Sequence, residues 1–201
     1  VMAAIAPEDR FTMLTTPAYL AAHSAVLGAL LNGACLLPFD VRTLGLAAMA
    51  DWLEQEALTI YQSPPSLFRA FARQLPKGRV FPSLRFLRLG GEPVLLSDLE
   101  LFREHFSPNA QFFNTFGISE AGGNVAYLRT DRESAFAGPL LPIGSPSEGQ
   151  DVFLADDFGK PVPHGEVGEI VVRSEFLATG YYRRPELTAR KFRTSADGRR
   201  E

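Results

Sequence analysis

Polar side chains of several chemical kinds gather in the short segment Asn114–Glu120, which reads NTFGISE and follows a β-prone run. It contains an amide, an aromatic ring, a glycine, a hydroxyl group and a carboxylate. Such a set suits a nucleotide, because a ring can pack on a base, a hydroxyl can donate to a phosphate oxygen, and a carboxylate can hold a hard cation. An Asx-turn followed by a helix capped by Ser119, with Glu120 on the surface, explains the same residues equally well.

A second segment with unusual residues is Leu89–Glu92, which reads LGGE and also follows a β-prone run. Adjacent glycines let a flat or charged ligand approach the backbone closely, because they carry no side chain. The alternative interpretation is an ordinary tight turn between a strand and a helix.

The elements that must position these segments alternate along the chain. Hydrophobic patterning and Pro/Gly punctuation predict strands at 11–14, 35–39, 58–61, 84–89 and 111–113, and helices at 18–31, 46–55, 66–74 and 96–106. This alternation predicts an α/β fold with a mainly parallel sheet flanked by helices. Ligands of such sheets bind beyond the carboxyl ends of the strands, where both segments are expected to lie.

The residue composition of the sequence changes after about residue 138. Proline and glycine recur, and an alternating strand is predicted at 169–173. We therefore expect an α/β subdomain at 1–137 that carries both polar segments, and a β-rich, barrel-like subdomain at 138–201. The boundary could equally separate two layers of one domain.

Composition narrows the class of protein. Apolar residues make up 46% of the chain and charged residues 21%, with 20 basic and 23 acidic residues and a net charge of -3. No dense Lys/Arg block is present, so neither nucleic acid nor an anionic membrane is an expected partner. No apolar run approaches the ~18 residues of a membrane span, so we expect a cytoplasmic protein. The one cysteine, Cys35, lies in an apolar run and is expected to be a buried structural thiol.

Three motifs, taken in order, resemble a known family. They are RLGGEP, NTFGISEA and the block GEVGEI…GYYRRPELTARKF. They resemble the large N-terminal domain of the acyl-adenylate-forming (AMP-binding) superfamily, most closely the adenylation domains of nonribosomal peptide synthetases. The resemblance implies a two-step reaction, in which a carboxylic acid and ATP give an acyl-adenylate and pyrophosphate, and a thiol then takes the acyl group. That thiol belongs to phosphopantetheine on a carrier protein or to coenzyme A.

The resemblance also implies roles for single residues. Glu120 is implied to hold Mg²⁺, and Ser119 to contact phosphate; both are therefore candidate catalytic residues. Phe116 replaces the family's usual tyrosine and is expected to keep an aromatic face against adenine. The residues implied around the adenine edge are Gly91, Glu92 and Asn114.

A substrate pocket follows from the same comparison. Leu20 stands where peptide-synthetase relatives carry an aspartate that pairs with the substrate's ammonium group, and a buried ammonium without a counter-charge is costly. This disfavours a standard α-amino acid held in the usual way. Arg88 could pair with a second acidic group of the substrate, or it could be a strand residue that faces solvent. The expected lining residues are Leu20, Ala21, Ser24, Gln62, Arg88, Gly90, Thr115, Gly123 and Asn124.

Other family segments do not occur in the sequence. These are the Gly-rich phosphate loop that ends in lysine, the Thr-Gly-Asp segment that binds ribose, and the small C-terminal lid domain with its lysine. We therefore expect an internal fragment of an adenylating enzyme that is inactive alone. The alternatives are a fragment of an acyl-CoA ligase and a truncated, non-catalytic binding module of the same fold.

Overall fold

The computed structural model describes residues 5–195 and 197–201, and the chain divides into two compact units. The first unit comprises the chain up to Phe116 together with Tyr127–Gly144. The second comprises Gly117–Ala126 together with Ser145–Glu201. From the sequence we expected a boundary near residue 138, and its role as a division between subdomains stays a prediction. The tip of a hairpin, Gly117–Ala126, groups with the second unit, within which the Ala178 N–H donates to the Glu120 carbonyl at 2.7 Å.

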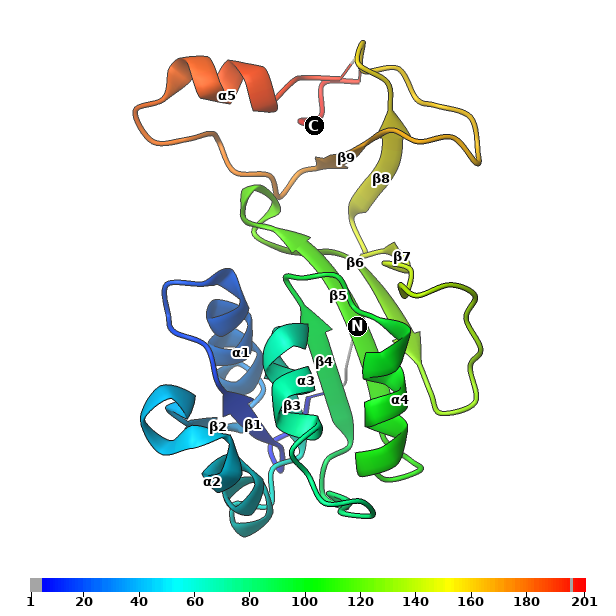
Figure 1. Ribbon diagram of the computed structural model, residues 1–201. Coiled ribbons are helices and arrows are strands. Elements are labelled where there is room, and N and C mark those ends of the chain that lie inside the picture. Colours follow the sequence, from blue (N-terminus) through cyan, green and yellow to red (C-terminus); the bar gives the residue numbers. More distant parts are fainter. Residues whose placement is uncertain (1–4, 196) are drawn as a thin grey trace. The chain divides into compact units, whose positions relative to one another are not determined.

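The first unit contains a mainly parallel sheet (Figure 1). Its strands run in the spatial order β2-β1-β3-β4-β5-β6, and the successive pairs from β2 to β5 are parallel. The strands are β1 (Arg10–Met13), β2 (Cys35–Pro38), β3 (Ile60–Ser63), β4 (Phe86–Gly90), β5 (Gln111–Ile118) and β6 (Gly123–Thr130). The expected α/β class with a mainly parallel sheet is confirmed.

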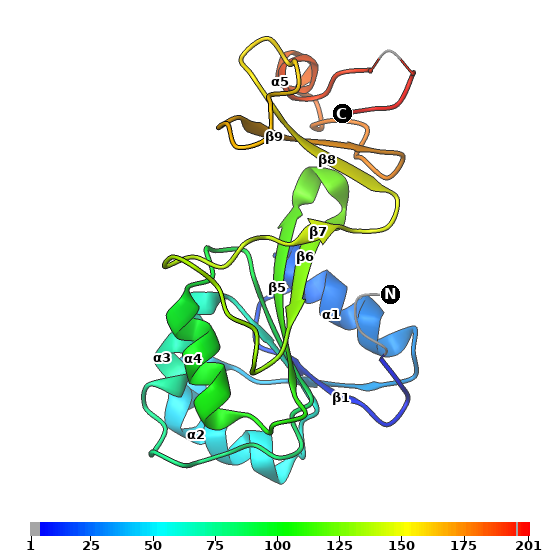
Figure 2. The same ribbon diagram turned by 90° about the vertical axis from the view of Figure 1, so that its right-hand side faces the viewer.

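Helices cover both faces of this sheet. They are α1 (Leu20–Leu30), α2 (Val41–Gln55), α3 (Pro65–Ala72) and α4 (Leu96–His105). Figure 2 shows α1 on one side of the sheet and the other three helices on the opposite side. The larger core, which includes Leu87, Leu89 and Phe112, lies on the side of α2, α3 and α4. The smaller core joins Phe86 and Phe113 of the sheet to alanines of α1.

Strand alternation assigns each site candidate to one of these faces. Successive side chains of a strand point to opposite faces, so Arg88 and Gly90 share the α1 face with Phe86. By the same rule Gln62 lies on the same face as Ile60, and Thr115 lies on the same face as Phe113. The parallel sheet therefore collects polar residues of three neighbouring strands beneath α1.

The second unit is smaller and contains an antiparallel pair of strands. These are β8 (Gln150–Ala155) and β9 (Glu169–Ser174), preceded by the two-residue strand β7 (Ser145–Pro146). The expectation of a small antiparallel sheet is confirmed. A helix that we did not predict, α5 (Pro185–Lys191), follows; Pro185 in its first turn and basic residues in its last turn suit a helix.

One expectation about the core was wrong. Cys35 is a free, exposed thiol. It lies at the start of β2, which is the edge strand of the sheet and carries no fully buried side chain. Among the described residues, no helix is long and apolar enough to cross a membrane.

Candidate functional site

The turn after β4 carries two of the expected nucleotide-binding residues. Gly91 has φ of 85°, a backbone conformation that glycine adopts without strain. The space where a side chain would lie is open. The Glu92 carboxylate accepts hydrogen bonds from the Ser66 backbone N–H at 3.0 Å and from the Ser66 hydroxyl at 2.8 Å. Glu92 therefore closes the first turn of α3, where an anion also suits the positive end of the helix.

Gly90 lies against the backbone of β5. A Cβ atom there would come within 2.3 Å of Thr115 Oγ1 and 2.7 Å of the Thr115 carbonyl oxygen. The Thr115 hydroxyl itself donates to the Leu89 carbonyl at 2.9 Å. This position requires glycine because the two strands leave no room for a methyl group.

Most of the expected acid-pocket residues lie together in the first unit. Gln62 Nε2 donates to the Ala21 carbonyl at 2.7 Å, which ties β3 to the first turn of α1. Arg88 is paired in register with Gln62 on one side and with Phe113 on the other. Ala21 is exposed, whereas Leu20 and Ser24 are half-buried, so this end of the helix is partly accessible to solvent. The residues that the structure places on α1 or on the α1 face of the sheet are Leu20, Ala21, Ser24, Gln62, Arg88, Gly90 and Thr115.

Arg88 is the one positive charge in this set, and it is half-buried. Burial lowers the pKa of the Arg88 guanidinium to about 10. The group therefore keeps its charge at neutral pH while it has lost part of its hydration. The alternative that Arg88 is a strand residue facing solvent is narrowed to a residue that is only partly exposed.

The segment that we expected to be a loop is largely strand. β5 continues to Ile118, so Asn114, Thr115 and Phe116 lie within it. Asn114 is 4% exposed, and its amide donates to the Pro142 carbonyl at 2.8 Å. Asn114 and Phe116 face away from α1, opposite to Thr115, and Phe116 is half-buried. Asn114 thus fastens the 139–142 segment to the sheet.

The expected catalytic pair belongs to the second unit. Ser119 and Glu120 form a single 3₁₀ turn with Ala121, and left-handed Gly122 ends this turn. Ser119 is exposed, and Glu120 is half-buried. Gly123 and Asn124, the remaining pocket candidates, lie in the same unit at the start of β6.

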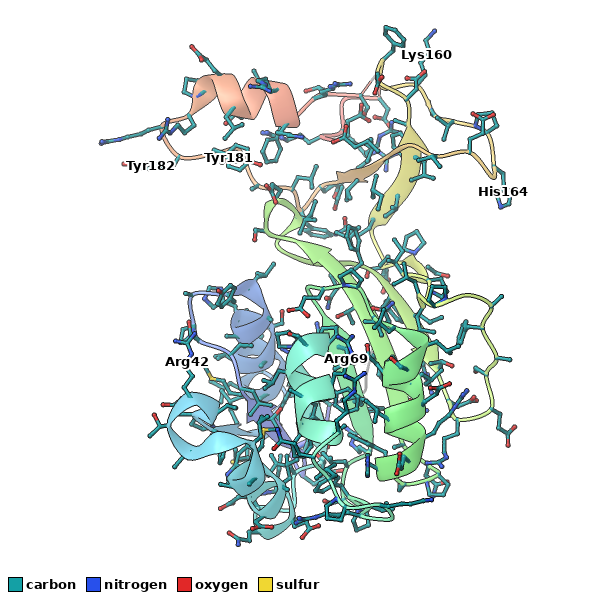
Figure 3. The ribbon with its side chains drawn as sticks, viewed as in Figure 1. Arg42, Arg69, Lys160, His164, Tyr181 and Tyr182 are labelled. Carbon is teal, nitrogen blue, oxygen red and sulfur yellow. The ribbon has the colours of Figure 1, made fainter. Side chains whose placement is uncertain are left out.

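Sequence reasoning missed the residue that holds the Glu120 side chain. The Tyr181 hydroxyl donates to Glu120 Oε1, and this bond holds the pKa of the Glu120 carboxyl below its ordinary value. Figure 3 shows Tyr181 in the segment between β9 and α5. Its ring packs edge-on against Phe192 at 5.5 Å between centroids, and its N–H donates to Thr188 Oγ1 at 2.9 Å. Glu120 is therefore ionised and fixed in place.

A cavity of about 290 Å³ opens beside this pair within the second unit. Its walls carry both Glu120 and Tyr181, and they include charged residues of both signs. The basic residues in its wall are Arg190, Lys191 and Arg193. Tyr181, Arg190 and Lys191 fall in the block GYYRRPELTARKF, and Arg193 follows it directly, but nothing in their spacing pointed to Glu120.

The site residues fit a Mg²⁺ ion that is shared with a phosphate ligand. Among residues 5–195 and 197–201, no group of three or more His, Cys, Asp or Glu side chains could enclose a metal ion. Mg²⁺ is usually held by one or two carboxylates together with water and substrate phosphates. Ionised Glu120, held by the Tyr181 hydroxyl at Oε1, suits such a site.

Comparison with known proteins identifies the family. The family described as "AMP-binding enzyme" matches residues 2–182. The chain belongs to this family. It is 34% identical over 192 residues to a dimodular nonribosomal peptide synthase of Bacillus subtilis (strain 168), covering 92% of this chain and 8% of that protein. It is 33% identical over 193 residues to a feruloyl-CoA synthase of Amycolatopsis sp, covering 92% of this chain and 37% of that protein.

Solved structures of AMP-binding family relatives share the fold. The crystal structure of the nonribosomal peptide synthetase FmoA3 superposes with a TM-score of 0.89 at 26% identity, over 98% of this chain and 22% of that one. Its AMPPNP-bound form gives a TM-score of 0.88 at 25% identity, with the same coverage. The chain thus spans a minor part of the length of these relatives.

Proposed function

We propose that this chain is part of a ligase that activates a carboxylic acid with ATP, giving an acyl-adenylate and pyrophosphate. The observation that carries the proposal is the family match over residues 2–182. The fold agreement with a peptide synthetase that also has an AMPPNP-bound form supports ATP as the nucleotide.

We propose that residues of the first unit bind the acid and that residues of the second unit bind the metal ion and the phosphates. The α1 face of the sheet, with Gln62, Arg88 and Thr115, holds the acid. Glu120 supplies one carboxylate oxygen to Mg²⁺, and exposed Ser119 donates to a phosphate oxygen. Mg²⁺ held by Glu120 would supply the positive charge that offsets the negative charge of the phosphates. Fixed charges of this kind account for much of the rate acceleration in phosphoryl chemistry.

We propose the remaining nucleotide contacts for residues on β5 and in the turn after β4. Phe116 and Asn114 lie on one side of β5, and Gly91 provides an open backbone position after β4. We propose that these residues, with Glu92, border the adenine. Because Glu92 already binds Ser66, we expect it to shape the turn more than to contact the base directly.

The thiol acceptor that we favour is phosphopantetheine on a carrier protein, because peptide synthetases are among the relatives. Coenzyme A is the second candidate, and the similarity to a feruloyl-CoA synthase favours it. Incubating the acyl-adenylate with either acceptor and following thioester formation by mass spectrometry distinguishes the two. We further propose that the chain needs the rest of its polypeptide for catalysis and works in the cytoplasm.

The test is acid-dependent exchange of pyrophosphate into ATP by the complete polypeptide that contains this chain. A panel of amino, hydroxy, aryl, keto and fatty acids is compared in the parent and in Glu120→Ala. We expect exchange with one class of acid and a loss of about 100-fold or more in the variant. Glu166→Ala, an exposed carboxylate of the same unit, is the control and should exchange normally. A folded parent that exchanges with no acid would point to a non-catalytic binding module.

A further inference from the structure

Arg88 has an unusual position for a charged side chain. It lies on β4, in the middle of the sheet, with β3 and β5 on either side. Within the described part of the chain, no hydrogen bond, ion pair or aromatic contact engages its guanidinium. By contrast, the arginines Arg69 and Arg79 each pair with carboxylates at 2.8 Å.

The layer around Arg88 also lacks an internal counter-ion. Helix α1 contains no Asp or Glu, and its one titratable side chain, His23, is exposed. The in-register neighbours of Arg88 are the neutral residues Gln62 and Phe113. Asp9, the buried carboxylate just before β1, is already paired with Arg85.

This arrangement is costly for the protein alone. Burial withdraws water from the guanidinium, and no protein group replaces the lost hydrogen bonds. The lowered pKa of Arg88 has burial as its only cause. A ligand that brings a negative charge to this place would remove the cost.

Two neighbouring features point the same way. Gln62 is 8% exposed, its Nε2 is bound to Ala21, and its Oε1 is buried without a hydrogen-bond partner. That oxygen needs a donor, which a ligand can supply. The first turn of α1, to which Gln62 is bound, has no side-chain cap on its N-terminus, so its positive end is available to an anion.

We propose that Arg88 and Gln62 form a specificity subsite, and that the acid activated here carries a second anionic group, a carboxylate, that pairs with the Arg88 guanidinium. A hydroxyl or amino group of the same substrate donates to Gln62 Oε1. A planar guanidinium binds a carboxylate through two parallel hydrogen bonds, which selects against neutral groups of the same shape. This inference rests on the proposed adenylating function.

The experiment measures pyrophosphate exchange in the complete polypeptide with paired substrates. Each pair is a dicarboxylic acid and its half-amide, which differ in the charge of the second group, and the pairs include aliphatic and aromatic acids of several lengths. We expect kcat/KM to favour the diacid of the best pair by about 10- to 100-fold. Arg88→Met should abolish this preference, and Arg88→Lys should keep part of it. Arg73→Met, on the exposed end of α3, is the control and should leave the preference unchanged.

The outcomes separate the two claims. The subsite would be overturned if exchange preferred the half-amides and Arg88→Met did not alter that preference. Adenylation would still stand. Absence of exchange with every acid in a folded parent would overturn the proposed function and the subsite with it. A preference for diacids that disappears in Arg88→Met and persists in Arg73→Met supports the subsite.

Discussion

The ion pair between Asp98 and Arg69 ties α4 to α3, and we predict that Asp98→Asn destabilises the first unit strongly. Asp98 is 0% exposed, and its carboxylate accepts from Arg69 Nε and Nη2 at 2.8 Å each and from the Leu95 N–H at 2.9 Å. Asparagine keeps one acceptor oxygen but turns an amide N–H₂ group toward the guanidinium donors. Figure 3 labels Arg69, which projects from α3.

The size of the effect follows from burial. Breaking a buried ion pair by removing one partner costs about 3–5 kcal/mol. The Arg69 side chain remains 21% exposed and can be partly hydrated, so we expect the lower end, about 3 kcal/mol. Asp51→Asn is the matched control: Asp51 also pairs with an arginine at 2.8 Å, but its side chain is 65% exposed. An exposed pair of this kind contributes about 0.5 kcal/mol.

Urea unfolding followed by tryptophan fluorescence measures both variants. Trp52, the one tryptophan of the chain, lies on α2 and packs against Phe39 at 4.7 Å between centroids, so it reports on the first unit. With a slope of about 2 kcal/mol/M, Asp98→Asn should lower the midpoint by roughly 1.5 M and Asp51→Asn by about 0.25 M. Equal shifts for the two variants would show that burial does not set the strength of the Asp98 pair.

Two further predictions concern the candidate site. Gly90→Ala should destabilise the first unit by about 1–3 kcal/mol, because its methyl group would meet the Thr115 backbone, whereas Gly123→Ala, with open space, should change stability by less than about 0.5 kcal/mol. Urea unfolding followed by far-UV circular dichroism, which reports on both units, checks both variants, and a neutral Gly90→Ala would contradict the close approach of β4 and β5. Tyr181→Phe should raise the Mg²⁺ concentration needed for half-maximal exchange by about 10-fold, because Glu120 loses its positioning hydrogen bond. An unchanged Mg²⁺ dependence would assign Tyr181 a role in packing alone.

The succession of strands and helices along the chain was predicted well, because each strand and helix carries its own local pattern. Apolar runs bounded by Pro and Gly located β3 and β4, and the helical period located α1 and α4. The same local patterns led to errors where the burial of a side chain depends on which other elements pack against its strand. Cys35 lies in an apolar run typical of a buried strand, yet β2 is an edge strand and the thiol is exposed.

The candidate site was harder to predict because its contacts join distant segments. Tyr181 and Glu120 are 61 positions apart, and no pattern in either segment indicates that they meet. The alternation of polar and apolar residues around Arg88 is typical of a strand with one solvent-exposed face. In the structure α1 covers that face of the sheet, so Arg88 is half-buried. The length of β5 was underestimated because Gly117 and the polar residues before it suggested a loop.

The most direct measurement for adenylation follows an oxygen atom. The complete polypeptide is incubated with ATP and an activated acid labelled with ¹⁸O in its carboxylate, and the acyl group is then captured by hydroxylamine, which attacks the carbonyl carbon. If the carboxylate attacks the α-phosphate, one labelled oxygen remains on the AMP that is released. Unlabelled AMP, or label in inorganic phosphate together with ADP, would contradict acyl-adenylate formation.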